Sequence, residues 1–390
     1  MKTKEDYYNF IYTKLISTFP QKPWTTALNN IKKANKPTVK QLVDYFIPYG
    51  IELWENKGNA EYDDYLNSTI SDSFYYCGKI LELFELIKPN HQERFKSRFN
   101  AAFRQPHDMR ALIFETFVFF TLAYYGYNIE CKDDDSTGET YDYLIKKDTS
   151  KVQIECKSFA YDKGLYITGD EAQKIIDYIL EMRDDFNINE NPTGEISLLT
   201  VEITSSPKNL GELTKSISSK IREKNYTSTE DFILHLERHT NVKDISDTDA
   251  ALDFLHLNQH GVNLGLCVSP PNNDQSRYGL IITTHATNGF LREFEKVCKD
   301  AAKKQLKKNH PASIIVHIYN IELLKDLLDD SRFHQKINNI FMQDHIISLI
   351  IISNIQTHTQ IEYPFFYISP FIKEFVNNNS KFIQQASKIL

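Results

Sequence analysis

The sequence predicts an α/β protein with a helical N-terminal region. Apolar residues recur with the period of a helix up to about residue 98, whereas short runs rich in β-branched and aromatic residues begin at Tyr127. Three such runs are followed by a helical segment and another strand-like run. Strands that alternate with helices in this way are typical of an α/β arrangement.

The composition is that of a folded globular chain. Hydrophobic residues make up 41% and charged residues 25% of 390, and 13 Gly with 13 Pro exclude collagen-like or low-complexity classes. Five scattered cysteines without a C-x-x-C pair predict reduced thiols in the cytoplasm. The N-terminus has no apolar signal core and no apolar stretch is suited to span a membrane, so no membrane association is expected.

The chain divides into three predicted segments. Residues 1–98 form a helical region, because their apolar residues stand three or four positions apart and prolines interrupt the pattern. Residues 99–205 follow as the α/β core. Its expected elements are a helix at 106–126, strands at 127–132, 141–146 and 151–158, a helix at 169–183 and a strand at 195–204.

Residues 206–390 are an α/β extension or a second domain that could bind a substrate or a partner. Two helices are expected after the capping-box residues Ser228 and Ser246. A basic helix at 291–308 lies among five expected strands, at 262–268, 278–284, 312–319, 345–353 and 364–369. Whether this segment extends the first sheet stays open.

One acid-x-Lys pattern stands out from three copies. The copies begin at Glu55, Glu130 and Glu155, but only the third lies within an apolar strand and follows, by thirteen residues, an acid that begins another strand, Asp142. In a strand, Glu155 and Lys157 point to one face, which Asp142 can reach from a neighbouring strand. Carboxylate oxygens with a backbone carbonyl and water suit a hard cation such as Mg²⁺.

Glu115 is the only charged residue between Arg110 and Glu130. A helix that is apolar all round is buried, and an unpaired buried carboxylate is costly, so Glu115 is expected to have a cationic or metal-linked partner. The alternative is a structural carboxylate bonded to Tyr or His side chains.

Over roughly residues 100–205 these features resemble the PD-(D/E)-x-K nuclease superfamily, whose restriction-endonuclease-like core runs helix, three strands, helix, strand. The resemblance implies that Asp142, Glu155 and Glu115 bind Mg²⁺, which Mn²⁺ can replace, and that Lys157 positions or activates the attacking water. Gln173 matches a glutamine of some RecB-like members.

The implied activity is hydrolysis of phosphodiester bonds, expected in DNA, by an endonuclease or an exonuclease. Restriction, antiviral defence and DNA repair are equally compatible tasks. The proline of the family's first half-motif is replaced by Tyr141. The subfamily, the number of metal ions, and whether the chain forms a homo-oligomer or has a partner protein stay open.

The net charge of −7 requires that any nucleic-acid contact come from local basic patches. One such patch is a stripe on the basic helix, with a solvated face as the alternative: Lys296, Lys299, Lys303 and Lys307. A second basic region, from Lys88 to Arg110, is equally open.

Two other functions are compatible with the sequence. A non-catalytic nucleic-acid-binding or assembly protein could retain the fold, although Asp142, Glu155 and Lys157 argue against it. A zinc-dependent hydrolase could use two pairs of histidines at helical spacing, although exposed helix positions are the better interpretation: His235 with His239, and His256 with His260. The acidic run Asp133–Asp135 is expected to be a solvated loop.

Overall fold

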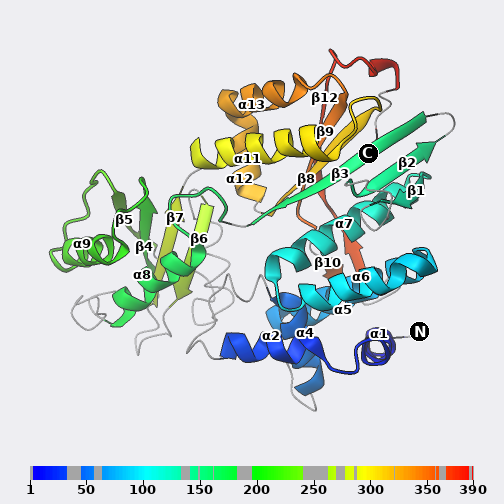
Figure 1. Ribbon diagram of the computed structural model, residues 1–390. Helices are drawn as coiled ribbons and strands as arrows, with labels where there is room; N and C mark the ends of the chain where they lie inside the picture. The colour runs from blue at the N-terminus through cyan, green and yellow to red at the C-terminus, as the bar shows by residue number, and fades with distance from the viewer. Residues whose placement is uncertain are drawn as a thin grey trace. The chain divides into compact units, whose positions relative to one another are not determined.

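The computed structural model confirms the α/β class. It describes residues 3–32, 45–56, 64–132, 141–147, 150–160, 162–181, 196–239, 262–268, 277–284, 288–319, 321–355, 357–359, 366–385 and 389. The chain divides into two compact units, each with its own sheet (Figure 1). The first comprises Met1–Tyr161, Phe294–Leu324 and Ser331–Leu390, and the second comprises Asp162–Glu293 and Lys325–Asp330.

The N-terminal region is helical, as the apolar spacing predicts. Its helices are α1 (Lys4–Thr18), α2 (Pro23–Lys32), α4 (Phe46–Asn56), α5 (Asp64–Leu86) and α6 (Pro89–Ala102), followed by α7 (Pro106–Tyr124). Thr3 begins α1 with a capping box, in which its side chain and that of Asp6 each accept a backbone N–H. Proline at the first position of α6 and α7 starts both helices without the loss of a hydrogen bond.

A six-stranded sheet crosses the first unit in the order β1-β2-β3-β8-β9-β12. Its strands are β1 (Asn128–Cys131), β2 (Tyr143–Lys147), β3 (Ser150–Phe159), β8 (Ala312–Ile318), β9 (Ile346–Ser353) and β12 (Phe371–Val376). The first three strands, which were expected as strands, form an antiparallel meander, and β3, β8 and β9 are parallel to one another. A separate hairpin joins β10 (Thr357–Thr359) to β11 (Phe366–Ile368).

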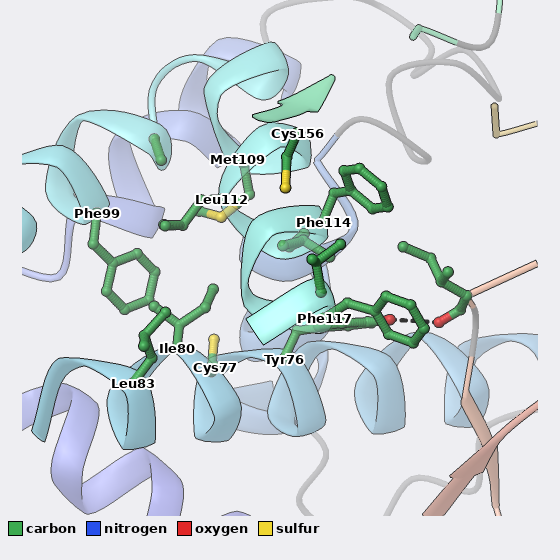
Figure 2. Close-up of a cluster of buried hydrophobic side chains, with 14 of the residues drawn as sticks. Tyr76, Cys77, Ile80, Leu83, Phe99, Met109, Leu112, Phe114, Phe117 and Cys156 are labelled. Atoms are coloured by element: carbon green, nitrogen blue, oxygen red, sulfur yellow. Dashed lines mark hydrogen bonds between the residues drawn. The ribbon is translucent and has the colours of Figure 1, made fainter. Parts of the chain in front are cut away.

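Helices cover both faces of this sheet (Figure 1). On one face Cys156 of β3 points toward α7, in an apolar cluster with Phe114, and α5 packs behind α7 (Figure 2). On the other face α11 (Asn288–Asp300) places Phe294 against Phe159 of β3, with ring centroids 5.7 Å apart. A π-helix, η2 (Ala301–Gln305), continues α11, so the basic helix ends at Gln305.

Two helices between β8 and β9 were missed by the sequence prediction: α12 (Ile321–Asp329) and α13 (Ser331–Phe341). Helix α13 packs on α11 through Phe333, whose ring centroid is 4.9 Å from that of Phe294. Among the residues that the structure describes, none of the helices is long and apolar enough to cross a membrane.

The second unit has a four-stranded sheet in the order β5-β4-β7-β6. Its strands are β4 (Ile196–Ile203), β5 (Phe232–His239), β6 (Val262–Val268) and β7 (Arg277–Thr284). Helix α8 (Gly169–Glu181) contacts β6 at Gly265, where an added Cβ would lie 2.7 Å from Ile176 Cδ1. Helix α9 (Leu210–Arg222), which the sequence prediction missed, contacts α8.

The structure corrects two expectations about these elements. Strand β4 pairs with β5 and β7 and not with the first sheet, so α8 and β4 do not complete the predicted core of 99–205. The helix expected after Ser228 is strand β5, because Thr229 Oγ1 accepts the N–H of Asp231 and Phe232 and turns the chain into an extended segment. The helix expected after Ser246 lies outside the described residues.

Candidate active site

The structure brings Asp142, Glu155 and Lys157 together at the end of the β2–β3 ladder. The paired register ends with Tyr143 opposite Ile154, so Asp142 follows in line with Glu155. Asp142 Oδ2 accepts the backbone N–H of Cys156 at 2.6 Å, and Lys157 Nζ donates to Glu155 Oε1 at 2.5 Å. The Asp142 and Glu155 side chains are buried, whereas Lys157 is partly exposed.

Glu115 approaches the same strand end from α7. The hydroxyl of Tyr143 donates to the backbone carbonyl of Glu115 at 2.9 Å and so fixes α7 against the first residue of β2. The Glu115 carboxylate is buried, and Arg98 of α6 donates from Nη2 to both of its oxygens at 2.6 Å. The cationic partner expected for Glu115 is therefore Arg98.

The three carboxylates interact electrostatically. Burial raises the pKa of Asp142 well above its usual value, and the neighbouring charges of Glu155 and Glu115 raise it further. Burial alone would lower the pKa of Lys157, but the charge and hydrogen bond of Glu155 outweigh it and raise that pKa above its usual value. The site thus holds three acidic side chains and two positively charged ones, Arg98 and Lys157, in a partly desolvated environment.

The donor chemistry of this site fits a hard divalent cation. Carboxylate oxygens from α7, β3 and the start of β2 are the ligand type that Mg²⁺ prefers, and a cation would offset the crowding of acids that raises the pKa of Asp142. Over the described part of the chain, no group of three His, Cys, Asp or Glu side chains is already arranged to hold a metal ion. Glu155 would offer the cation its Oε2, since the hydrogen bond from Lys157 uses Oε1.

Gln173 is not grouped with these residues. It lies on α8 in the second unit and donates from Nε2 to Asp177 Oδ1 at 3.0 Å. The helix that precedes a strand parallel to β3 is α11, since α11 and η2 lead directly to β8. The match of Gln173 to a family glutamine therefore has no support from the packing of α8.

The interpretation of His235 and His239 as zinc ligands assumed that both lie on a helix, and this assumption is wrong. Both lie on strand β5, where four residues span about 13 Å, so side chains that leave the same face in parallel do not converge on one ion. His239 lies 3.2 Å from Glu237, a carboxylate of its own strand. The pair at His256 and His260 and the run Asp133–Asp135 lie outside the described residues.

The predicted lysine stripe is divided by the structure. Lys299 is bound to Glu295 at 2.6 Å, and Lys336 and Asn339 of α13 bind the same carboxylate. Burial would raise the pKa of Glu295, but these three hydrogen bonds lower it to about 2, so Lys299 is part of the α11–α13 contact. The three other lysines of the stripe are exposed: Lys296, Lys303 and Lys307.

The second acid-x-Lys copy has the contacts of an ordinary surface cluster. Glu130 of β1 accepts a hydrogen bond from Lys146 of the neighbouring strand, and Lys132 Nζ lies 3.4 Å from Glu130 Oε2. The bond from Lys146 lowers the pKa of Glu130, the reverse of the shift at Asp142. Glu130 is also about one-third exposed.

Sequence reasoning did not select Arg98 as a site residue, and placed it only in the broad basic region before α7. The signal that could have selected it is the isolation of Glu115 in an apolar helix, because a buried carboxylate needs a nearby cation. The sequence does not say which of several basic residues supplies that cation.

Comparisons of the chain with protein-family models, with curated proteins and with solved structures find no match.

Proposed function

We propose that the protein is a metal-dependent nuclease with a restriction-endonuclease-like core, which hydrolyses phosphodiester bonds, with DNA as the expected substrate. The observation that carries the proposal is the meeting of Asp142 and Glu155 across one antiparallel ladder, with Lys157 bonded to Glu155 and Glu115 beside them. Three acids and a lysine grouped in one largely buried site are suited to metal-assisted hydrolysis. For a purely structural ion pair, the desolvation of so many charged groups would cost stability.

The order of elements around these residues supports the same proposal. Helix α7, strands β1, β2 and β3, helix α11 and strand β8 follow the order helix, three strands, helix, strand, with β8 parallel to β3. This order differs from the one expected from the sequence only in its last helix and strand. Most of the second unit separates β3 from α11 along the chain.

The residues have distinct parts in the proposed reaction. Asp142, Glu155 and Glu115 would hold Mg²⁺ or Mn²⁺. Such a cation, when bound, neutralises the scissile phosphate, lowers the pKa of a water and stabilises the leaving oxygen. Lys157 would orient the attacking water, since its Nζ already lies beside Glu155. Arg98 would keep Glu115 ionised; it contacts both carboxylate oxygens, so one of them would have to turn to the metal ion.

The second candidate is a nucleic-acid-binding or assembly protein that does not cut. It is favoured by the ion pairs of Glu155 with Lys157 and of Glu115 with Arg98, which offset the charge of two of the three acids without a metal ion. Asp142 belongs to neither ion pair. It is buried, accepts the backbone N–H of Cys156 and has its pKa raised by that burial and by the two other acids, and a purely structural role does not explain why a third acid lies here.

Cleavage assays separate the two candidates. Purified protein is incubated with plasmid, linear duplex, single-stranded DNA or RNA in the presence of Mg²⁺, Mn²⁺ or EDTA. We expect cleavage of at least one substrate with Mg²⁺ or Mn²⁺, none with EDTA, and none with Glu155→Gln. Glu130→Gln is the matched control, because it makes the same change in the other acid-x-Lys copy. Binding without metal-dependent cleavage of any substrate would favour the second candidate.

A further inference from the structure

Four lysines gather where the basic helix ends. They are Lys303 and Lys304 in η2 and Lys307 and Lys308 directly after it, here called the lysine cluster, and all four are exposed. The segment 301–311 contains no acidic residue, although Asp300 directly before it lies 3.1 Å from Lys304, so the cluster as a whole is a local positive patch on a chain of net charge −7. The partial negative charge of a helix C-terminus favours lysines in its last turn, but Lys307 and Lys308 lie beyond it.

A hydrogen bond fixes this cluster to the catalytic strand. The backbone N–H of Lys307 donates to Gln153 Oε1 of β3 at 2.7 Å, and the Gln153 side chain is buried. Because side chains alternate along a strand, Gln153, Glu155 and Lys157 leave β3 on one face. Two residues of strand span about 7 Å, so the cluster begins one such step from Glu155.

The helix itself follows the same face. The charge of Lys157 lowers the pKa of the Cys298 thiol, which burial raises, so Lys157 lies close to the buried side of α11. Phe294, one turn earlier, packs on Phe159. Helix α11 therefore runs along β3 from Phe159 toward Gln153, and the lysine cluster follows its Gln153 end, two strand residues from Glu155.

We propose that the lysine cluster binds the phosphate backbone of the nucleic acid next to the bond that is cut. This inference rests on the proposed function and names the surface that holds its substrate. Carboxylates repel the phosphates of a nucleic acid, whereas the lysines of the cluster attract them. Exposed lysines suit contacts to phosphates, and such contacts position a nucleic acid without reading its sequence. Lys299, which is bonded to Glu295, is not part of this surface.

Binding in EDTA tests the proposal without cleavage. The affinity for a labelled DNA duplex and for a labelled single strand is measured by fluorescence anisotropy at several salt concentrations. The triple variant Lys303→Glu, Lys307→Glu and Lys308→Glu should bind at least about tenfold more weakly at low salt. The slope of log affinity against log salt should fall by roughly one unit for each lost phosphate contact. Replacement of the same three residues by Arg should retain both values.

The matched control reverses three lysines elsewhere, Lys208→Glu, Lys215→Glu and Lys220→Glu, with the same change in net charge. Circular dichroism shows whether each variant is folded, and Lys→Gln at the three cluster positions replaces the reversal if it is not. An unchanged affinity and salt slope in the cluster variant would overturn the proposal. An equal loss of affinity in the control variant would also overturn it, since the effect would then come from net charge. So would polyglutamate that competes with the labelled DNA as well as unlabelled DNA does.

The test separates this inference from the proposed function. If the wild type binds DNA through the cluster but never cleaves with Mg²⁺ or Mn²⁺, the cluster stands as the nucleic-acid-binding surface and the nuclease activity fails. If the wild type cleaves and the cluster variant binds normally, the nuclease activity stands and the inference fails.

Discussion

Replacement of Arg98 by Met is expected to destabilise the metal-free protein by about 2–3 kcal/mol. Loss of one partner from a fully buried ion pair costs about 3–5 kcal/mol, because the other charge stays in a place that water does not reach. Glu115 is 8% exposed, but the Arg98 side chain is 28% exposed, so water compensates part of the loss. The contact of Arg98 Nη2 with both Glu115 oxygens at 2.6 Å makes the pair stronger than a flexible surface pair.

A double-mutant cycle measures this contribution. Glu115→Leu leaves Arg98 partly exposed to water and should cost less, and the double variant should recover most of the stability, since α7 is apolar around position 115. Urea unfolding of the four proteins at neutral pH gives the coupling energy, expected to be about 2 kcal/mol. Arg98→Lys, which keeps the charge and loses the planar guanidinium group, should fall between wild type and Arg98→Met. Effects that add to within about 0.5 kcal/mol would refute the reasoning.

Three further predictions concern the acids. Asp142→Ala, Glu155→Ala and Lys157→Ala should each abolish plasmid cleavage without unfolding the protein, and their effects should not add; one variant with a near-normal rate would contradict the assignment. Glu130→Ala with Lys132→Ala should leave the cleavage rate nearly unchanged, because both belong to a surface cluster, whereas a loss equal to that of Glu155→Ala would make this copy the catalytic one. Asp142→Asn should stabilise the metal-free protein at neutral pH. Because the pKa of Asp142 is higher in the folded than in the unfolded protein, the wild type loses stability as the pH rises from about 4 through the folded-state pKa. Asn does not titrate, so the variant does not lose this stability. Urea midpoints at acid and neutral pH measure the difference, and a difference that does not grow with pH would contradict the shift.

Local patterns were sufficient for the elements that carry the candidate site. The apolar run around Glu115 forms α7, and the three short strand-like runs form β1, β2 and β3 within one or two residues of their expected bounds. The antiparallel pairing of β2 with β3 agrees with their two-residue connection, because a parallel pair needs a connection of a dozen or more residues. The alternation of Glu155 and Lys157 with apolar residues therefore placed both on one face correctly.

Non-local pairing was not predictable in the same way. The strand beside the second half of β3 is β8, and the paired residues Ser158 and His317 stand 159 positions apart in the chain. Nothing in the composition of β4 distinguishes it from such a partner, since both strands are apolar and buried. Sequence order then favoured the nearer strand, although it belongs to another sheet.

The lysine stripe shows why spacing alone could not identify a binding surface. Steps of three and four residues place Lys296, Lys299 and Lys303 on one side of a regular helix, but they do not say what that side contacts. Helix α13, which the sequence prediction missed, binds Glu295 and draws Lys299 into the packing of the first unit. The π-helical turn and the bond from Lys307 to Gln153 then place Lys303 and Lys307 at the end of the helix. The helix period alone therefore could not separate a packing lysine from one that can meet a phosphate, and the missing information was the helix on the other side.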